Sequence, residues 1–69
     1  MPIYLANMME SHKIVQISGN DKTKAHLNNL GFIIGEEIML INKVDDNVIV
    51  KIRGISLAIS KELAKRILV

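Results

Sequence analysis

The sequence predicts a small, partly open β-barrel, a mainly β fold with short helices, one of them inserted after the first strand. Three observations support this prediction. The chain has 69 residues, 49% of them hydrophobic, and most of these are Ile, Leu or Val, which favour strands. Turn-forming residues divide the apolar runs into short segments. Closing short strands into a barrel removes exposed sheet edges. We expect residues 1–69 to form a single domain.

The first strand is expected over residues 12–18, a segment rich in β-branched side chains. Within it Val15 and Ile17 alternate with a glutamine, so the two apolar side chains should share one face. A polar break follows, and a short helix is expected over residues 22–30. The Asn-Asp pair at 20–21 can accept a hydrogen bond from the free N–H groups that open this helix.

The end of this helix is the clearest local signal in the sequence. With Leu30 as the C-cap, Gly31 can adopt the left-handed conformation that ends a helix without a Cβ penalty. Leu27 and Phe32 then occupy the two positions that touch in a Schellman motif. We therefore expect these two side chains to pack together and to turn the chain back onto the core.

A meander of three strands is expected next. Gly35 should supply the positive φ of a type II turn over residues 33–36, which starts a second strand at 37–43. Residues 45–47 should form a polar hairpin loop before a third strand at 48–53. A tight turn at Gly54 leads to a fourth strand at 55–59. The residues of the last two strands expected to face the core are Val48, Val50, Ile52, Ile55, Leu57 and Ile59.

The end of the chain is expected to form a short helix and a final strand. Ser60 can cap the helix at its start. Leu63 and Ile67 stand four residues apart, which predicts that they share one helical face. Residues 68–69 should then close the sheet as a short strand.

No residue pattern predicts catalysis. The chain has no Cys, no Gly-x-Ser-x-Gly sequence and no glycine-rich phosphate loop. Two pairs of adjacent carboxylates occur, at 36–37 where the expected second strand begins and at 45–46 in an expected loop. Neighbouring strand residues point to opposite faces, and acids are common in turns. We therefore predict no catalytic residues and no enzymatic activity.

The sequence does not predict a metal site or a cofactor. A metal site needs several ligands that converge on one point. His12 and His26 do not stand at a spacing from each other or from carboxylates that is typical of such a site. Met8, Met9 and Met39 are expected to fill the core rather than to act as soft-metal ligands.

Charge is distributed unevenly along the chain. Up to residue 46, four lysines face six acids, a net charge of −2, whereas from residue 47 onward five cations face one acid, a net charge of +4. The C-terminal part should thus present a basic surface. Nucleic-acid binding is not expected, because Tyr4 and Phe32 are the only aromatics on which bases could stack. No apolar run reaches the roughly 20 residues of a membrane span, so we expect a cytoplasmic protein without membrane insertion.

Two segments resemble a known family. Residues 27–35 read LNNLGFIIG, which resembles the Leu-x-x-Leu-Gly-Phe-x-x-Gly signature of the FeoA family, ferrous iron transport protein A. Residues 54–59, GISLAI, with the apolar positions at 63–64 and 67–69, are similar to the closing segment of that family. The resemblance covers nearly the whole chain. It implies an SH3-like barrel with a helix inserted after the first strand.

The resemblance also implies a function. FeoA proteins are small cytoplasmic accessory proteins of bacterial ferrous iron uptake. They are thought to act on the membrane transporter FeoB, which carries a cytoplasmic GTP-binding domain, and they catalyse no reaction themselves. The chain would then be a monomer or weak homo-oligomer that reaches the inner face of the membrane through its partner. Ser11 and Ile34 depart from the pattern of the family, both at turns.

Two alternatives belong to other classes of protein. The same barrel resembles the C-terminal domain of iron-dependent repressors, where it serves regulation. That domain accompanies a DNA-binding winged helix, which this sequence lacks, so a repressor role would require a separate partner protein. A generic SH3-like module that binds Pro-rich peptides would need an aromatic-lined groove, for which the chain has too few aromatic residues.

Two surfaces are candidates for partner binding. The first is the exposed side of the helix, from residue 22 through 29, with the apolar groove beside it. Its candidate contact residues are Lys22, Lys24, His26, Leu27 and Asn28. The rival surface consists of the basic residues Lys51, Arg53, Lys65 and Arg66. If the partner binds there, we expect the affinity to fall steeply as the salt concentration rises. The positions assigned to the structure of the fold are Leu27, Leu30, Gly31, Phe32, Gly35 and Gly54.

Overall fold

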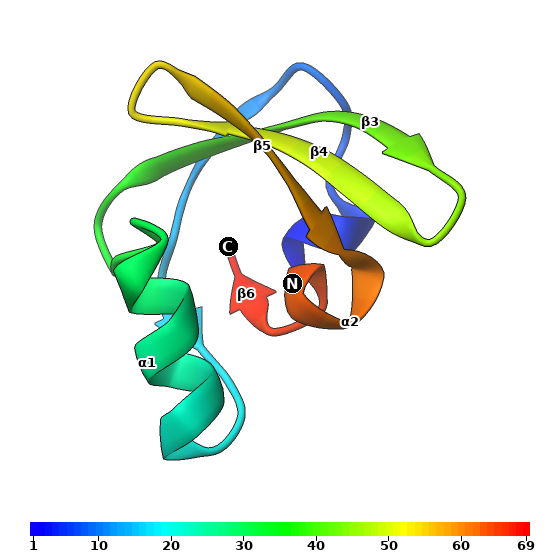
Figure 1. Ribbon diagram of the computed structural model, residues 1–69. Coiled ribbons are helices and arrows are strands. Elements are labelled where there is room, and N and C mark those ends of the chain that lie inside the picture. The colour runs from blue at the N-terminus through cyan, green and yellow to red at the C-terminus, as the bar shows by residue number, and fades with distance from the viewer.

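All 69 residues are described by the computed structural model, in which a four-stranded sheet arches over a core closed from the other side by a two-stranded sheet and short helices (Figure 1). The strands are β1 (Ser11–Lys13), β2 (Gln16–Ile17), β3 (Glu37–Val44), β4 (Asn47–Ile52), β5 (Ile55–Ser60) and β6 (Ile67–Leu68). The helical elements are the 3-10 turn η1 (Ile3–Leu5), α1 (Asp21–Asn29) and α2 (Lys61–Ala64).

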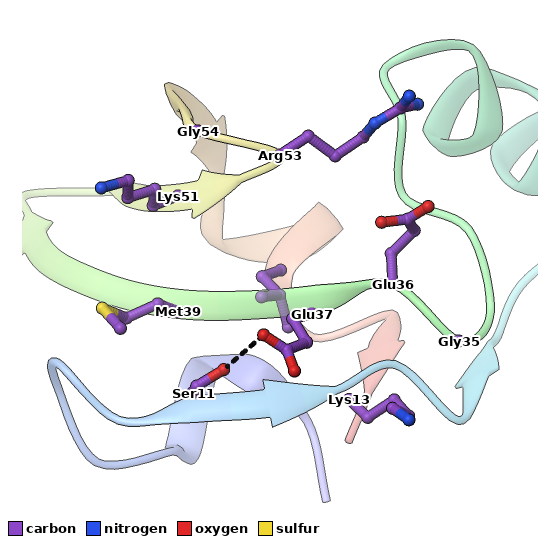
Figure 2. Close-up of a pocket in the computed structure, with 10 residues that line it drawn as sticks. Ser11, Lys13, Gly35, Glu36, Glu37, Met39, Lys51, Arg53 and Gly54 are labelled. Carbon is purple, nitrogen blue, oxygen red and sulfur yellow. Dashed lines mark hydrogen bonds between the residues drawn. The ribbon is translucent and has the colours of Figure 1, made fainter.

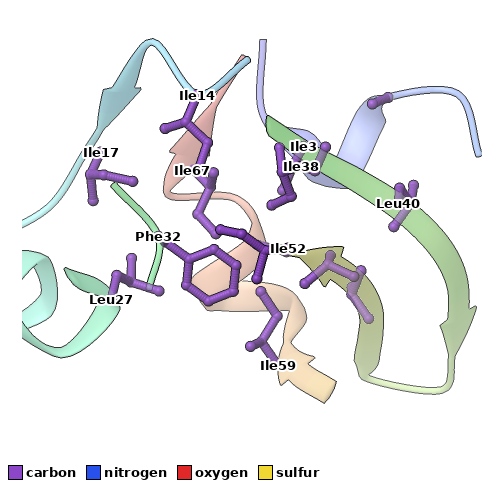
Figure 3. Packing of buried hydrophobic residues seen from close by; sticks show 14 residues of the cluster. Ile3, Ile14, Ile17, Leu27, Phe32, Ile38, Leu40, Ile52, Ile59 and Ile67 are labelled. Atoms are coloured by element: carbon purple, nitrogen blue, oxygen red, sulfur yellow. The ribbon is translucent and has the colours of Figure 1, made fainter. Parts of the chain in front are cut away.

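The two sheets form a partly open barrel, as predicted. The larger has the order β1-β3-β4-β5 and the smaller pairs β2 with β6, and every pair is antiparallel. No strand pairing joins the sheets to each other. Buried side chains from both sheets and both α-helices form one hydrophobic cluster between them (Figure 3). None of the helices has the length and apolar character needed to cross a membrane.

The segment predicted as a single first strand is divided between the two sheets. β1 pairs with β3, and the N–H of Ile14 extends this contact by donating to the Glu36 carbonyl at 2.9 Å. The N–H of Val15 instead donates to the carbonyl of Leu68 in β6 at 2.8 Å. Where the chain passes from the large sheet to the small one, Ile14 and Ile17 are buried and Val15 is 59% exposed. The expectation that Val15 and Ile17 share a face was therefore wrong, because neighbouring residues here belong to different sheets.

Both α-helices begin at polar caps that the sequence predicts. The Oδ1 atom of Asn20 accepts a hydrogen bond from the N–H of Thr23 at 2.8 Å. The Oγ atom of Ser60 accepts one from the N–H of Leu63 at 3.2 Å. Each bond satisfies one of the N–H groups that the first turn of a helix leaves without a partner.

The predicted Schellman motif ends α1. Leu30 is the C-cap and Gly31 has a φ of 103°. The N–H of Phe32 donates to the Leu27 carbonyl at 3.0 Å, and the N–H of Gly31 donates to the Asn28 carbonyl at 3.0 Å. Leu27 and Phe32 are both fully buried in the cluster that Figure 3 shows. The end of the helix thus anchors the chain to the core.

The turns around β3 also follow the sequence, with one shift. Gly35 has a φ of 95°, and the N–H of Glu36 donates to the Ile33 carbonyl at 3.0 Å, as in the predicted type II turn. The next hairpin turns through residues 45–46 alone. Asn47, which was expected in the loop, opens β4 instead.

Core-facing residues were predicted correctly on β4 and only in part on β5. The three expected on β4 are all buried. On β5, Ile59 is buried and Leu57 is half-buried, but Ile55 is 60% exposed. The expectation for Ile55 was wrong because β5 is the last strand of its sheet, and no further strand covers the start of it.

The C-terminal segment contains less helix than predicted. α2 is a single turn whose buried residue is Ala64, and Leu63 packs at the margin of the core. Ile67 is buried in β6 and not on the helix. The predicted helical face of Leu63 and Ile67 was therefore wrong. The final strand begins at Ile67 rather than at residue 68.

β6 is held on both of its sides, which brings the two ends of the chain together (Figure 1). On one side Leu68 pairs with Gln16 in β2, and on the other it bridges Pro2. The terminal ammonium of Met1 donates to the Val69 carbonyl at 2.7 Å, and the N–H of Val69 donates back to the Met1 carbonyl at 2.7 Å.

The methionines near the N-terminus lie on the surface, so their assignment to the core was wrong. Met8 is 48% exposed and Met9 is 64% exposed. Met9 has a φ of 62°, and its N–H donates to the Leu40 carbonyl at 2.7 Å. The backbone and not the side chain of Met9 thus contacts β3. Met39 is half-buried.

Candidate partner-binding surface

The exposed face of α1 carries four of the five predicted contact residues. Lys22, Lys24, His26 and Asn28 are all exposed to solvent. Leu27 is fully buried, because it is the residue of α1 that packs into the core beside the helix cap. A partner cannot reach Leu27 without unfolding the helix end. Its place among the contact residues is therefore corrected.

An apolar groove of about 410 Å³ lies beside α1. It runs between the C-terminal end of α1 and the β4–β5 hairpin. The residues that line it are Asn29, Leu30, Gly31, Ile52, Arg53, Ile55 and Leu57. Leu30 is 39% exposed and Ile55 is 60% exposed, so apolar side chains on both walls are open to solvent. The sequence predicts a groove beside the helix, and the structure locates it at the cap.

The groove is a consequence of how α1 ends. The left-handed turn at Gly31 directs Phe32 into the core and leaves Leu30 outside it. Across the groove, the Arg53–Gly54 turn, with φ values of 53° and 79°, brings Ile55 back opposite Ile52 at the edge of the sheet. Two local turns thus set the two walls of one surface depression.

A more polar hollow of about 500 Å³ lies on the outer face of the large sheet (Figure 2). Its charged residues are Lys13, Glu36, Glu37, Lys51 and Arg53. The Oγ atom of Ser11 donates to Oε2 of Glu37 at 3.4 Å, the dashed line in Figure 2. Because both signs of charge line this hollow, it presents no strong field of one sign to a partner.

The four residues of the rival basic set do not gather in one place. Lys51 and Arg53 line the outer hollow. The Nζ atom of Lys65 lies 5.6 Å from the centre of the Tyr4 ring, next to α2. Arg66 follows it, and its carbonyl accepts a hydrogen bond from the loop before α1. The structure therefore divides this set between the β4–β5 hairpin and the segment after α2 (Figure 1).

The two histidines lie on different elements. His12 is half-buried in β1, with its Nε2 atom 3.6 Å from Oε1 of Glu10, and His26 is exposed on α1. No group of three or more His, Cys, Asp or Glu side chains is arranged to hold a metal ion.

The sequence profile of the FeoA domain matches residues 1–69. The chain belongs to the FeoA family. The match includes the segment at 27–35, which contains the helix cap, and the segment at 54–59, which forms the turn at Gly54 and most of β5. No curated protein sequence matches the chain.

Solved structures share the fold of this FeoA-family chain. A FeoA-like protein from Clostridium acetobutylicum is 26% identical with a TM-score of 0.87, covering 99% of this chain and 81% of that one. FeoA from Stenotrophomonas maltophilia, determined with zinc and described as a prokaryotic SH3 domain protein and candidate ferrous iron transport activating factor, is 23% identical with a TM-score of 0.82, covering 99% and 87%. The predicted SH3-like fold is confirmed.

The fold also occurs in a regulator. A manganese-dependent transcriptional repressor is 10% identical to this chain with a TM-score of 0.86. The match covers 97% of this chain and 39% of the repressor. At this identity the likeness concerns the fold alone.

The sequence interpretation placed a groove beside the helix without naming the residues that line it. It assigned Ile55 and Leu57 to the core, Arg53 to the rival surface, and Leu30 and Gly31 to the fold alone. The structure brings all five together around the groove. A signal for this was present, because the segment at 55–60 contains no charged residue and could have been recognised as one half of a contact surface.

Proposed function

We propose that this protein is a non-enzymatic accessory protein of bacterial ferrous iron uptake. It acts in the cytoplasm by binding the GTP-binding domain of a FeoB-like membrane transporter, and it reaches the membrane through that partner. Membership of the FeoA family supports the link to ferrous iron transport. The observation that supports binding is the apolar groove beside α1, because exposed apolar surface of this kind commonly marks an interaction site.

The binding surface consists of the exposed face of α1 and the groove at its end. Lys22, Lys24 and Arg53 contribute positive charge, and Leu30 and Ile55 contribute exposed apolar area. Burying the apolar part supplies affinity, whereas the charges orient the partner and raise the association rate. The matching surface on the transporter should be apolar with an acidic rim.

Replacing a groove residue tests this surface. Leu30→Asp places a charge in the apolar wall, so we expect affinity for the purified cytoplasmic domain of the transporter to fall at least about tenfold, equivalent to about 1.4 kcal/mol. Isothermal titration calorimetry measures this. Val15→Asp is the matched control, because Val15 is 59% exposed and lies outside the groove. Equal binding by both variants would show that the groove is not the contact, and absence of binding by the unchanged protein would refute the proposed function.

The effect on the transporter is a separate measurement. GTP hydrolysis by the transporter and ferrous iron uptake should be compared with and without this protein. A change in either activity that Leu30→Asp abolishes would connect the surface to the function.

A second candidate function is regulation of an iron-dependent repressor as a separate SH3-like partner. This candidate rests on the fold alone, which the chain shares with part of the manganese-dependent repressor. Genomic neighbourhood distinguishes the two candidates, because a neighbouring gene for a large GTP-binding transporter favours the first and a neighbouring repressor gene favours the second.

A further inference from the structure

β5 is a free edge of the large sheet. The order β1-β3-β4-β5 leaves it with β4 as its only neighbour. Because the turn at 53–54 has two residues, Ile52 and Ile55 form a hydrogen-bonded pair at its base. Hydrogen bonding alternates along an antiparallel strand. The N–H and C=O groups of Ser56 and Ala58 therefore point away from β4, toward solvent.

The sequence of β5 contains none of the features that usually prevent an edge strand from pairing with another strand. β5 reads ISLAIS, without charge, proline or a bulge in its pairing with β4. The opposite edge is protected, because β1 has only three residues, includes Lys13, and follows Met9 in a left-handed conformation. Short length, lysine and local distortion are the usual devices that prevent a strand edge from pairing. β5 has none of them, which indicates that its edge is kept available.

The apolar side chains on the inner face of the sheet are not fully covered at the start of β5. Ile52 is 3% exposed, whereas Ile55, paired directly with it, is 60% exposed. Ile55 and Leu57 instead face the groove whose far wall is Leu30 and Gly31. One more strand along β5 would direct every second side chain into this groove.

We propose that β5 accepts an extended segment of the partner as an additional strand, with apolar residues at alternate positions and an acidic residue beside Arg53. The inference rests on the proposed function, since the segment belongs to the transporter's cytoplasmic domain. Main-chain bonds to Ser56 and Ala58 supply affinity, and the groove selects the alternate side chains. Arg53 is the only charged residue that lines the groove. We therefore expect the partner segment to place an acidic residue beside it.

Charge disfavours a second copy of this chain as the occupant. β5 has no acidic residue to place beside Arg53. Pairing two β5 strands would also bring Lys51 and Arg53 of each copy into one continuous sheet, while each chain carries a net charge of +2.

Ala58→Pro tests the strand addition. Proline removes the outward N–H of residue 58 and leaves the hydrogen bonds to β4 in place, as it does on natural edge strands. We expect the cytoplasmic domain of the transporter to bind this variant at least about tenfold more weakly than the unchanged protein. The matched control, Ala58→Ser, keeps the N–H and should bind normally. Equal affinity of a folded Ala58→Pro for the domain would overturn the inference and leave the proposed function standing.

Amide hydrogen exchange in the unchanged protein gives a result that does not depend on how the variant folds. The N–H groups of Ser56 and Ala58 should exchange rapidly in the free protein and at least about tenfold more slowly in the complex. A complex that leaves both rates unchanged would refute strand addition alone, whereas failure to form a complex would refute both proposals. Slow exchange in the free protein with a doubled mass by light scattering would identify a second copy as the occupant and overturn the inference.

Discussion

Gly31 shows how a single residue shapes both the core and the surface. Its φ of 103° turns the chain after α1 and allows two hydrogen bonds back to the last turn of the helix. Phe32 is buried as a result, and Leu30 remains 39% exposed at the wall of the groove. The residue that ends the helix therefore also builds one side of the candidate binding surface.

The role of Gly31 predicts a specific stability change. A Cβ at this position would meet no atom within 4 Å, so Gly31→Ala should cost only the backbone penalty of a left-handed residue, about 1 kcal/mol in the free energy of unfolding. Gly31→Asn should cost less, because Asn adopts this conformation more readily. Urea denaturation measures both. A loss of several kcal/mol for Gly31→Ala would show that space and not conformation is limiting.

At the scale of elements, the two ends of α1 have different roles. Its first turn carries the exposed Lys22 and Lys24, and its last turn carries the buried Leu27 and the cap. Changes at the N-terminal end can therefore alter binding without disturbing the core.

Charge reversal on α1 tests this division. Lys22→Glu with Lys24→Glu should weaken binding to the transporter domain, most strongly at low salt, because exposed charges are screened as salt rises. Helix stability should not fall, since acidic residues are favoured in the first turn. Calorimetric titrations at two salt concentrations measure the effect. Lys13→Glu with Lys51→Glu is the matched double variant on the outer hollow, and a larger loss there would favour the rival basic surface.

β6 illustrates an element whose existence depends on the rest of the chain. It has two residues, yet β2 pairs with one side of it and Pro2 with the other. A strand of this length has little stability alone. Its position between two distant segments is what makes it part of the fold.

For the whole molecule, closure of the barrel depends on the last three residues. They supply the fully buried Ile67 and the contacts between the two ends of the chain. Deleting residues 67–69 removes a core side chain worth about 2–5 kcal/mol, close to the total stability of a domain of this size. We expect the truncated protein to be largely unfolded at room temperature.

Circular dichroism during heating measures the thermal unfolding of the truncated protein and of the full chain. Val15→Ser is the control, because Val15 lies just before β2 and is 59% exposed, so this change should leave the melting temperature nearly unchanged. A truncated protein that melts cooperatively near the temperature of the full chain would show that closure by β6 is dispensable.

The sequence by itself determined the elements that depend on near neighbours. The caps at Asn20 and Ser60, the helix end at Gly31 and the turn at Gly35 each involve residues within a few positions of one another, so their chemistry is visible in the sequence. The exposed surface of α1 could be predicted only in part, because Leu27 was placed among its contact residues although the packing at the helix cap buries it in the core.

Tertiary structure alone decided how segments that are distant in the sequence pair with one another. Val15 leaves the path of β1 because Leu68, from the other end of the chain, offers a carbonyl. Ile55 has the pattern of a core residue and is exposed because no strand follows β5 in the sheet. Pairing between distant segments is set by the whole packing arrangement and not by local spacing. The groove exists for this reason, since its two walls come from turns that are separated in the sequence and meet only in the fold.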